Sequence, residues 1–195
     1  MPRVVPPRPR NVTATDDERS RLLQAAPVHL RVFLLLCSDL AMRSGTAARI
    51  APKHYDPERG QVSFSTKFGD RLTLPVTQEL RNLFACANGP ADVPYVVQFN
   101  PRANSAVKPK HLANSLSLAL RRLRFRLGIT KRIIPHDLRR TTAVHVYENT
   151  HDLRKVQAVL GHRSLPQTLH YLDHNIMTPA LETLEDAKAK PRFDA

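Results

Sequence analysis

The stretch PHDLRRTTAVHVY, residues 135–147, combines a helix start with a cluster of basic side chains. Pro135 stands where proline suits a helix start, because the first helical amide has no helical partner. His136 and Arg139 lie three residues apart, so both side chains project from one face of the helix expected over 136–147. A guanidinium offers paired N–H donors, and the imidazole beside it exchanges a proton near neutral pH. The stretch therefore predicts a helix that binds a phosphodiester.

Positive charge gathers just before this helix. The chain has 195 residues and a formal net charge of +13, and residues 101–140 hold eleven lysines and arginines against Asp137 alone. A second helix, expected over 110–127, is apolar along SLSLAL and then strongly basic. Crowded guanidinium groups repel one another unless a polyanion relieves them, and a phosphate backbone does so with release of counterions. A solvated face is the plain alternative, but we expect double-stranded DNA to be bound here, by Arg121, Arg122, Arg124, Arg126 and Arg140.

Composition narrows the remaining classes. The hydrophobic share of 42% is typical of a globular protein, and the longest apolar run, VFLLLC at 32–37, is shorter than the roughly 18 residues that span a bilayer. With only two cysteines, the chain has no disulfide framework, which favours a reducing compartment, the cytoplasm. The glycines form no phosphate-cradling loop, and the histidines lack the HExxH spacing of a zinc site. We therefore expect no cofactor, no metal and no membrane association.

The length suits one domain, preceded by a proline-rich tail or linker over 1–13 and followed by a short tail over 191–195. The run GQVSFSTKFGDRLTLPV, residues 60–76, alternates in polarity around FGD and predicts a β-hairpin. PYVVQF, 94–99, reads as a short strand or buried loop. Other segments predict helices, and the class expected is mainly α with a small antiparallel β-sheet (α+β). One helix is expected to begin at the Thr15–Glu18 capping box, and a short one to run from a turn at Gly45 to Pro52. The others are expected over 28–42, 77–87 and 151–161, and after Pro166 and Pro179.

Taken together, these motifs resemble those of the tyrosine recombinase, or phage integrase, family. Five motifs stand in the family's order: LAMRSGTAARI with Arg43, STKFGDRLTLPV with Lys67, PHDLRRTTA with His136 and Arg139, LGHRS with His162, and TLHY with Tyr171. The intervals also agree, with 24 residues from Arg43 to Lys67, 23 from Arg139 to His162 and nine more to Tyr171. Single motifs of this kind are common, but five in order are specific. The resemblance covers residues 14–190, the catalytic domain.

The resemblance implies the fold of that catalytic domain and a DNA strand transferase, a site-specific recombinase of the integrase type. Tyr171 would attack a phosphate and form a 3′-phosphotyrosyl link, and it needs a base or cations nearby because a free phenol has a pKa near 10. The family's roles would fall on Arg43 and Arg139 as phosphate clamps, His162 as a further hydrogen-bond donor, Lys67 as the acid and His136 as the base. The family further implies a monomer that forms a homotetramer on DNA, with the helix after Pro179 packed on a neighbour.

Two departures keep alternatives open. Thr46 stands where the family usually has an acidic residue, and a proline-rich lead stands where many members have a helical DNA-clamping domain. The chain is therefore either a fragment of a longer protein or a short member of the family. Two alternative functions remain: a DNA-binding accessory or degenerate relative that does not cut, and a type IB topoisomerase-like enzyme that relaxes duplex DNA by cutting one strand. The motifs do not encode the target sequence or the direction of recombination.

Overall fold

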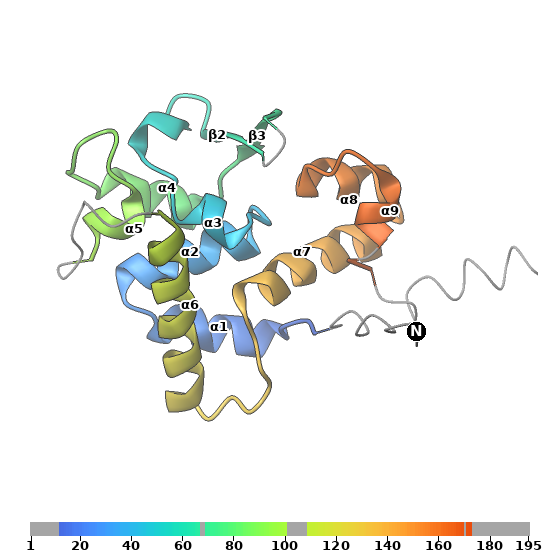
Figure 1. Ribbon diagram of the computed structural model, residues 1–195, viewed down its shortest axis with the longest axis horizontal. Coiled ribbons are helices and arrows are strands. Elements are labelled where there is room, and N and C mark those ends of the chain that lie inside the picture. Colours follow the sequence, from blue (N-terminus) through green and yellow to red (C-terminus); the bar gives the residue numbers. More distant parts are fainter. Residues whose placement is uncertain (1–11, 67–68, 101–108, 170, 173–195) are drawn as a thin grey trace, which may run out of the picture.

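A computed structural model describes residues 12–66, 69–100, 109–169 and 171–172 (Figure 1). Residues 1–11 of the tail predicted over 1–13, Lys67, the helix expected after Pro179 and the tail expected over 191–195 lie outside the described residues. Within them, helices dominate, and the predicted class of a mainly α protein with a small antiparallel sheet is confirmed. The elements are α1 (Asp16–Ala25), α2 (Val28–Ser38), α3 (Ser44–Ala47), a 3₁₀ turn (Pro52–His54), β1 (Tyr55–Asp56), β2 (Gln61–Ser65), β3 (Arg71–Pro75), α4 (Gln78–Ala85), α5 (Tyr95–Gln98), α6 (Pro109–Arg126), α7 (Pro135–Thr150), α8 (Leu153–Leu160) and α9 (Leu165–Leu169).

Helix α2 is the centre of the core. Every side chain from Val32 to Cys37 is 1% exposed or less, as expected for a helix that is apolar all round. It contacts α1 and α3 to α7, so these helices are arranged around it. Helix α8 packs on α7, and α9 packs on α8, so these two short helices form a group beside α7 (Figure 1).

Helix α2 ends earlier than its apolar pattern indicates. The pattern predicts a helix to Met42, whereas α2 stops at Ser38 and the chain turns at Ala41, where φ is +47°. The predicted turn at Gly45 is wrong, because Gly45 lies inside α3. A left-handed alanine costs about 1–3 kcal/mol and persists only where surrounding contacts hold it. Ala41 is completely buried, and its carbonyl has a specific partner in the site described below.

The predicted hairpin is confirmed as β2 and β3, which pair in register from Gln61↔Pro75 to Ser65↔Arg71. Alternation places Val62 and its partner Leu74 on the core side, while Ser63 and Thr73 lie on the other face with their hydroxyls 2.7 Å apart. The two-residue strand β1 adds a third, unpredicted strand along β2. The hairpin lies at the top of Figure 1, with α8 and α9 to its right.

PYVVQF is neither a strand nor a loop but forms the short helix α5, so that prediction is wrong. A run of this length cannot be assigned by periodicity, and packing decides it here. The Tyr95 ring stacks on Phe84 with centroids 4.0 Å apart, and the Gln98 side chain donates to the carbonyls of Pro90 and Val93. None of the described helices is both long and apolar enough to cross a membrane.

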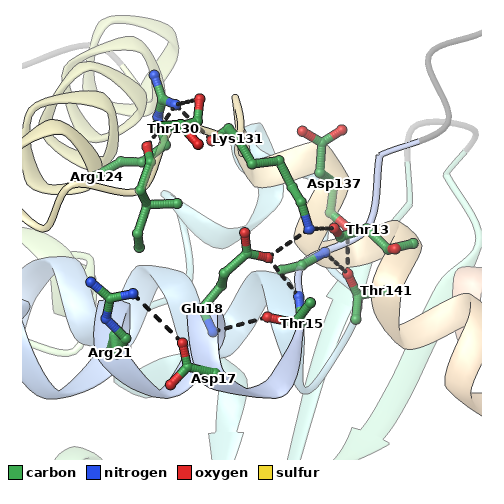
Figure 2. A network of polar contacts seen from close by, with 12 residues as sticks. Thr13, Thr15, Asp17, Glu18, Arg21, Arg124, Thr130, Lys131, Asp137 and Thr141 are labelled. Carbon is green, nitrogen blue, oxygen red and sulfur yellow. Dashed lines mark hydrogen bonds and ion pairs between the residues drawn. The ribbon is translucent and has the colours of Figure 1, made fainter.

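A polar network ties the start of α1 to α7 (Figure 2). The predicted capping box is confirmed, since Thr15 and Glu18 each accept from the other's backbone N–H. The Glu18 carboxylate also accepts from Lys131 Nζ at 2.7 Å, in the loop that leads into α7. The backbone N–H of Ala14 donates to the Thr141 hydroxyl, which lies on α7 itself. The helix with the predicted phosphate-binding pair is thereby fixed against the first helix.

Candidate active site

Arg139 lies at the centre of the site, on the second turn of α7. Its side chain is 3% exposed, and it joins three segments that are distant in sequence. Nη1 donates to the carbonyl of Ala41, and Nη2 donates to the carbonyl of Leu160 at 2.8 Å. Burial lowers the pKa of the guanidinium, while the neighbouring Tyr171 opposes that shift. Arginine remains charged in proteins, so the protein holds a cation at this buried position.

His162 accepts a hydrogen bond from Arg139. Its Nε2 lies 3.2 Å from Arg139 Nη2, and its Nδ1 lies 3.2 Å from the Thr168 hydroxyl. Because a guanidinium only donates, Nε2 must accept, which places the single proton of the neutral ring on Nδ1. Burial, then the charges of Arg139 and Arg43, lower the pKa of His162 to about 4. His162 is therefore neutral near pH 7.

Tyr171 follows α9, and four side chains surround its ring. The centroids of the His136 and His162 rings each lie 5.0 Å from that of the Tyr171 ring. The guanidinium carbons of Arg139 and Arg140 lie 5.4 and 5.7 Å from the same centroid. Arg139 is also within hydrogen-bonding reach of the Tyr171 hydroxyl. The tyrosine therefore has cations and imidazoles around it, the environment that an activated phenol requires.

Arg43 and His136 complete this cluster. Arg43 is half-buried and precedes α3, two residues after the left-handed Ala41. Its charge contributes to the lowered pKa of His136, Arg139 and His162, so it lies near all three. The pKa of His136 is lowered mainly by desolvation and then by Arg139, Arg140 and Arg43. A neutral His136 has a free lone pair that can take a proton.

The frame around Lys67 is described although Lys67 itself is not. The backbone N–H of Thr66 donates to the Asp70 carbonyl at 2.7 Å and closes the hairpin. Arg163, the residue after His162, donates twice to the Asp70 carboxylate, at 2.7 and 2.9 Å. A methyl group built on Gly161 would lie 3.4 Å from the Thr66 methyl. The hairpin end therefore lies against the loop that carries His162.

Residues 13–177 match the sequence model of the phage integrase family. The chain belongs to the phage integrase family. Over 161 residues it is 28% identical to the tyrosine recombinase XerC of Xanthomonas campestris pv. campestris (strain B100), covering 80% of this chain and 49% of that protein. XerC of Escherichia coli O127:H6 is 26% identical over 178 residues, covering 84% and 55%. The chain thus spans about half the length of these relatives.

Solved structures show the same fold as this phage integrase family chain. The XerA recombinase superposes with a TM-score of 0.69 at 21% identity, over 93% of this chain and 66% of that one. A lambda integrase dimer bound to a COC′ core site gives a TM-score of 0.65 at 18% identity, over 84% and 48%. The fold of a tyrosine recombinase catalytic domain, implied by the motifs, is therefore confirmed.

The five arginines expected to bind DNA in this phage integrase family chain divide into two groups. Three are exposed along α6, namely Arg121, Arg122 and Arg126, which we call the α6 arginine cluster. Arg124 does not belong to the expected DNA surface, because it is buried and only 5% exposed. Its guanidinium donates to the carbonyls of Ile129, Thr130 and Lys131 and so fixes the turn after α6 (Figure 2). Arg140 is also buried, 5% exposed, beside Tyr171.

Two residues of the site carried no signal in the sequence. Ala41 supplies a carbonyl to Arg139 from a backbone conformation with positive φ, which alanine rarely adopts. Thr168 is completely buried and contacts the His162 ring, yet in sequence it is one polar residue of a short helix. Among the described residues, no three His, Cys, Asp or Glu side chains are grouped as metal ligands would be.

Proposed function

We propose that this chain is a DNA strand transferase that acts as a site-specific recombinase through a 3′-phosphotyrosyl intermediate. The observation that carries this proposal is the enclosure of Tyr171 by two imidazoles and two guanidiniums, with Arg43 close by. Family membership supports it as well. Phosphoryl transfer depends mainly on positioning and on neutralising the non-bridging oxygens, which these cations supply.

In the first step the Tyr171 oxygen attacks the scissile phosphorus, and the bond from phosphorus to the 5′ oxygen breaks. The phenol proton passes to His136, whose lowered pKa leaves it neutral and able to accept. Lys67 gives a proton to the departing 5′ oxygen. Arg43 and Arg139 neutralise the non-bridging oxygens. A 5′-hydroxyl from a second DNA end then attacks the same phosphorus and gives its proton to Lys67. The bond from phosphorus to the Tyr171 oxygen breaks, His136 returns a proton to that oxygen, and the strand is rejoined. The phosphodiester energy stays in the covalent link, so the two transfers need no ATP, and the two arginines supply the charge neutralisation that a metal gives in other phosphoryl transfers.

His162 changes its role when the phosphate binds. In the free site its Nε2 accepts from Arg139, and the surrounding cations disfavour its protonation. A bound phosphate brings negative charge, which raises the pKa of a neighbouring imidazole. His162 then gains a proton on Nε2 and donates to a non-bridging oxygen, as the family resemblance implies.

The substrate we propose is double-stranded DNA. The α6 arginine cluster, exposed on one long helix, would contact the phosphate backbone, and binding would weaken as salt rises. We further propose that the protein is monomeric when free, forms a homotetramer on its DNA and acts in the cytoplasm. Light scattering with and without a duplex containing the target site would distinguish the two assembly states.

The experiment is a suicide substrate, a duplex nicked so that a short fragment leaves after cleavage and rejoining is blocked. The proposal predicts a covalent protein–DNA adduct in the native chain and none in Tyr171→Phe. A relative that binds DNA without cutting would shift the duplex on a native gel but form no adduct. A strand-relaxing enzyme would remove supercoils from a plasmid without the target site. Either result would replace the recombinase assignment.

A further inference from the structure

Tyr171 depends on tertiary contacts for its position. The helix before it, α9, has only five residues, and isolated helices of that length are unstable in water. Its contacts include the Thr168 hydroxyl against His162 and the buried side chain of Leu172, which is 4% exposed. The Tyr171 backbone N–H donates to the Thr168 carbonyl at 2.9 Å, within the same short segment. Besides its packing on α8, the segment is positioned by contacts with α7.

Arg140 makes such a contact. Its Nη1 donates to the backbone carbonyl of Tyr171 at 3.2 Å, and its guanidinium carbon lies 5.7 Å from the centre of the Tyr171 ring. The side chain is 5% exposed, so it is not part of an open surface like the α6 arginine cluster. Arg139, one residue earlier, donates instead to Ala41 and Leu160. The two adjacent arginines therefore both lie near the Tyr171 ring but hold different parts of the site.

We propose that Arg140 is a positioning residue, which sets the attack geometry of Tyr171 by holding its backbone carbonyl, and is not a DNA-binding residue. This inference rests on the proposed function, in which Tyr171 is the nucleophile. The carbonyl carbon is bonded directly to the Cα that carries the phenol, so releasing it moves the nucleophile as well. A displacement of about 1 Å in a reacting group can cost roughly 100-fold in rate. The contribution of Arg140 is therefore to rate and not to affinity.

The test compares two nucleophiles on one DNA. Arg140→Gln is expected to bind the duplex with unchanged Kd and to form the Tyr171 adduct about 10- to 100-fold more slowly at saturating DNA. Hydrogen peroxide, a small nucleophile that needs no positioning by the chain, replaces the phenol in a Tyr171→Phe background. There, Arg140→Gln should leave peroxide cleavage unchanged. Arg122→Gln, in the exposed cluster, is the matched control and should raise Kd while the saturated rate of adduct formation stays the same.

The outcomes separate the two proposals. If the native chain forms no adduct, the proposed function fails and the inference fails with it. If the native chain forms the adduct and Arg140→Gln matches its rate, or loses peroxide cleavage to the same degree, Arg140 acts on the phosphate or not at all. Should Arg140→Gln fail to fold, Arg140→Lys keeps a buried cation and donor. Its adduct rate should fall while peroxide cleavage and Kd hold, and equal losses in both reactions would overturn the proposal.

Discussion

Replacing Gly161 by alanine should both destabilise the chain and slow DNA cleavage, for two separable reasons. Gly161 follows α8 with φ of +60°, a left-handed conformation that costs an alanine about 1–2 kcal/mol. Its added methyl would also lie 3.1 Å from Leu72 Cδ2 and 3.4 Å from Thr66 Cγ2, both in the hairpin that carries Lys67. If Leu72 must leave its preferred rotamer, a further 0.5–1.5 kcal/mol or so is lost.

Gly128 supplies the control. Its φ is +66°, and a methyl built on it meets no atom within 4 Å. Gly128→Ala should therefore lose only the backbone cost, about 1–2 kcal/mol, while Gly161→Ala loses roughly 1.5–3.5 kcal/mol. Urea unfolding of both variants measures this difference. Equal losses would show that the hairpin does not press on Gly161.

The catalytic consequence follows from the position of the hairpin. The tight contact with Leu72 pushes the hairpin away from the loop that carries His162, and Lys67, the proposed acid, belongs to the same hairpin. Gly161→Ala should therefore cleave normal DNA roughly tenfold more slowly, less than the roughly 10²–10⁴-fold of a complete general-acid contribution. DNA with sulfur at the bridging 5′ position has a leaving thiolate that needs no protonation, so its cleavage should match that of the native chain. A slowing of equal size on both substrates would show that Gly161→Ala does not act through Lys67.

Three further outcomes are expected. Exchanging the α6 arginine cluster for glutamine should weaken binding to all DNA sequences, as measured by titration at several salt concentrations. The slope of log binding constant against log salt concentration should become shallower by about 0.9 for each phosphate that is no longer neutralised. Arg124→Gln should instead lower the free energy of unfolding in urea. The pKa of His162 is about 4 in the folded chain and returns to its ordinary value near 6.5 on unfolding, so the unfolded chain binds more protons between these pH values. The free energy of unfolding should therefore fall as the pH drops from about 6.5 towards about 4. Urea unfolding of His162→Gln should show a flatter pH dependence, by up to about 1.4 kcal/mol per pH unit. Glu18→Gln keeps the capping box but loses the ion pair to the partly exposed Lys131, so it should lower the free energy of unfolding by about 1 kcal/mol in the same assay. In a chain that already carries Lys131→Met, the same exchange should lower it no further.

Motifs predicted the fold and most of the residues around Tyr171, because each motif is a local pattern of a few residues. The pair His136 and Arg139 depends only on helix spacing, and the hairpin depends on alternation, so a short window contains each signal. Family order then brought Arg43, His162 and Tyr171 together, and the structure places these residues in one cluster.

What the sequence could not predict depends on long-range contacts. The apolar pattern predicts that α2 continues through Ala41. Instead the chain turns at Ala41, whose carbonyl accepts a hydrogen bond from Arg139, 98 residues later in the sequence. The density of positive charge predicted that Arg124 and Arg140 bind DNA together with their exposed neighbours. A run of basic residues does not reveal which side chain points into the protein. Burial separates them: each donates to backbone carbonyls of a distant or following segment.

The proposed mechanism depends above all on a covalent bond between the Tyr171 oxygen and the phosphorus of the cut strand. The bond can be located by trapping the adduct on a nicked duplex, digesting the protein and the DNA, and finding the modified residue by tandem mass spectrometry. We predict a nucleotide joined through its 3′ phosphate to Tyr171, with a free 5′-hydroxyl on the released strand. A phosphate on any other residue, or a link through a 5′ phosphate, would contradict the mechanism.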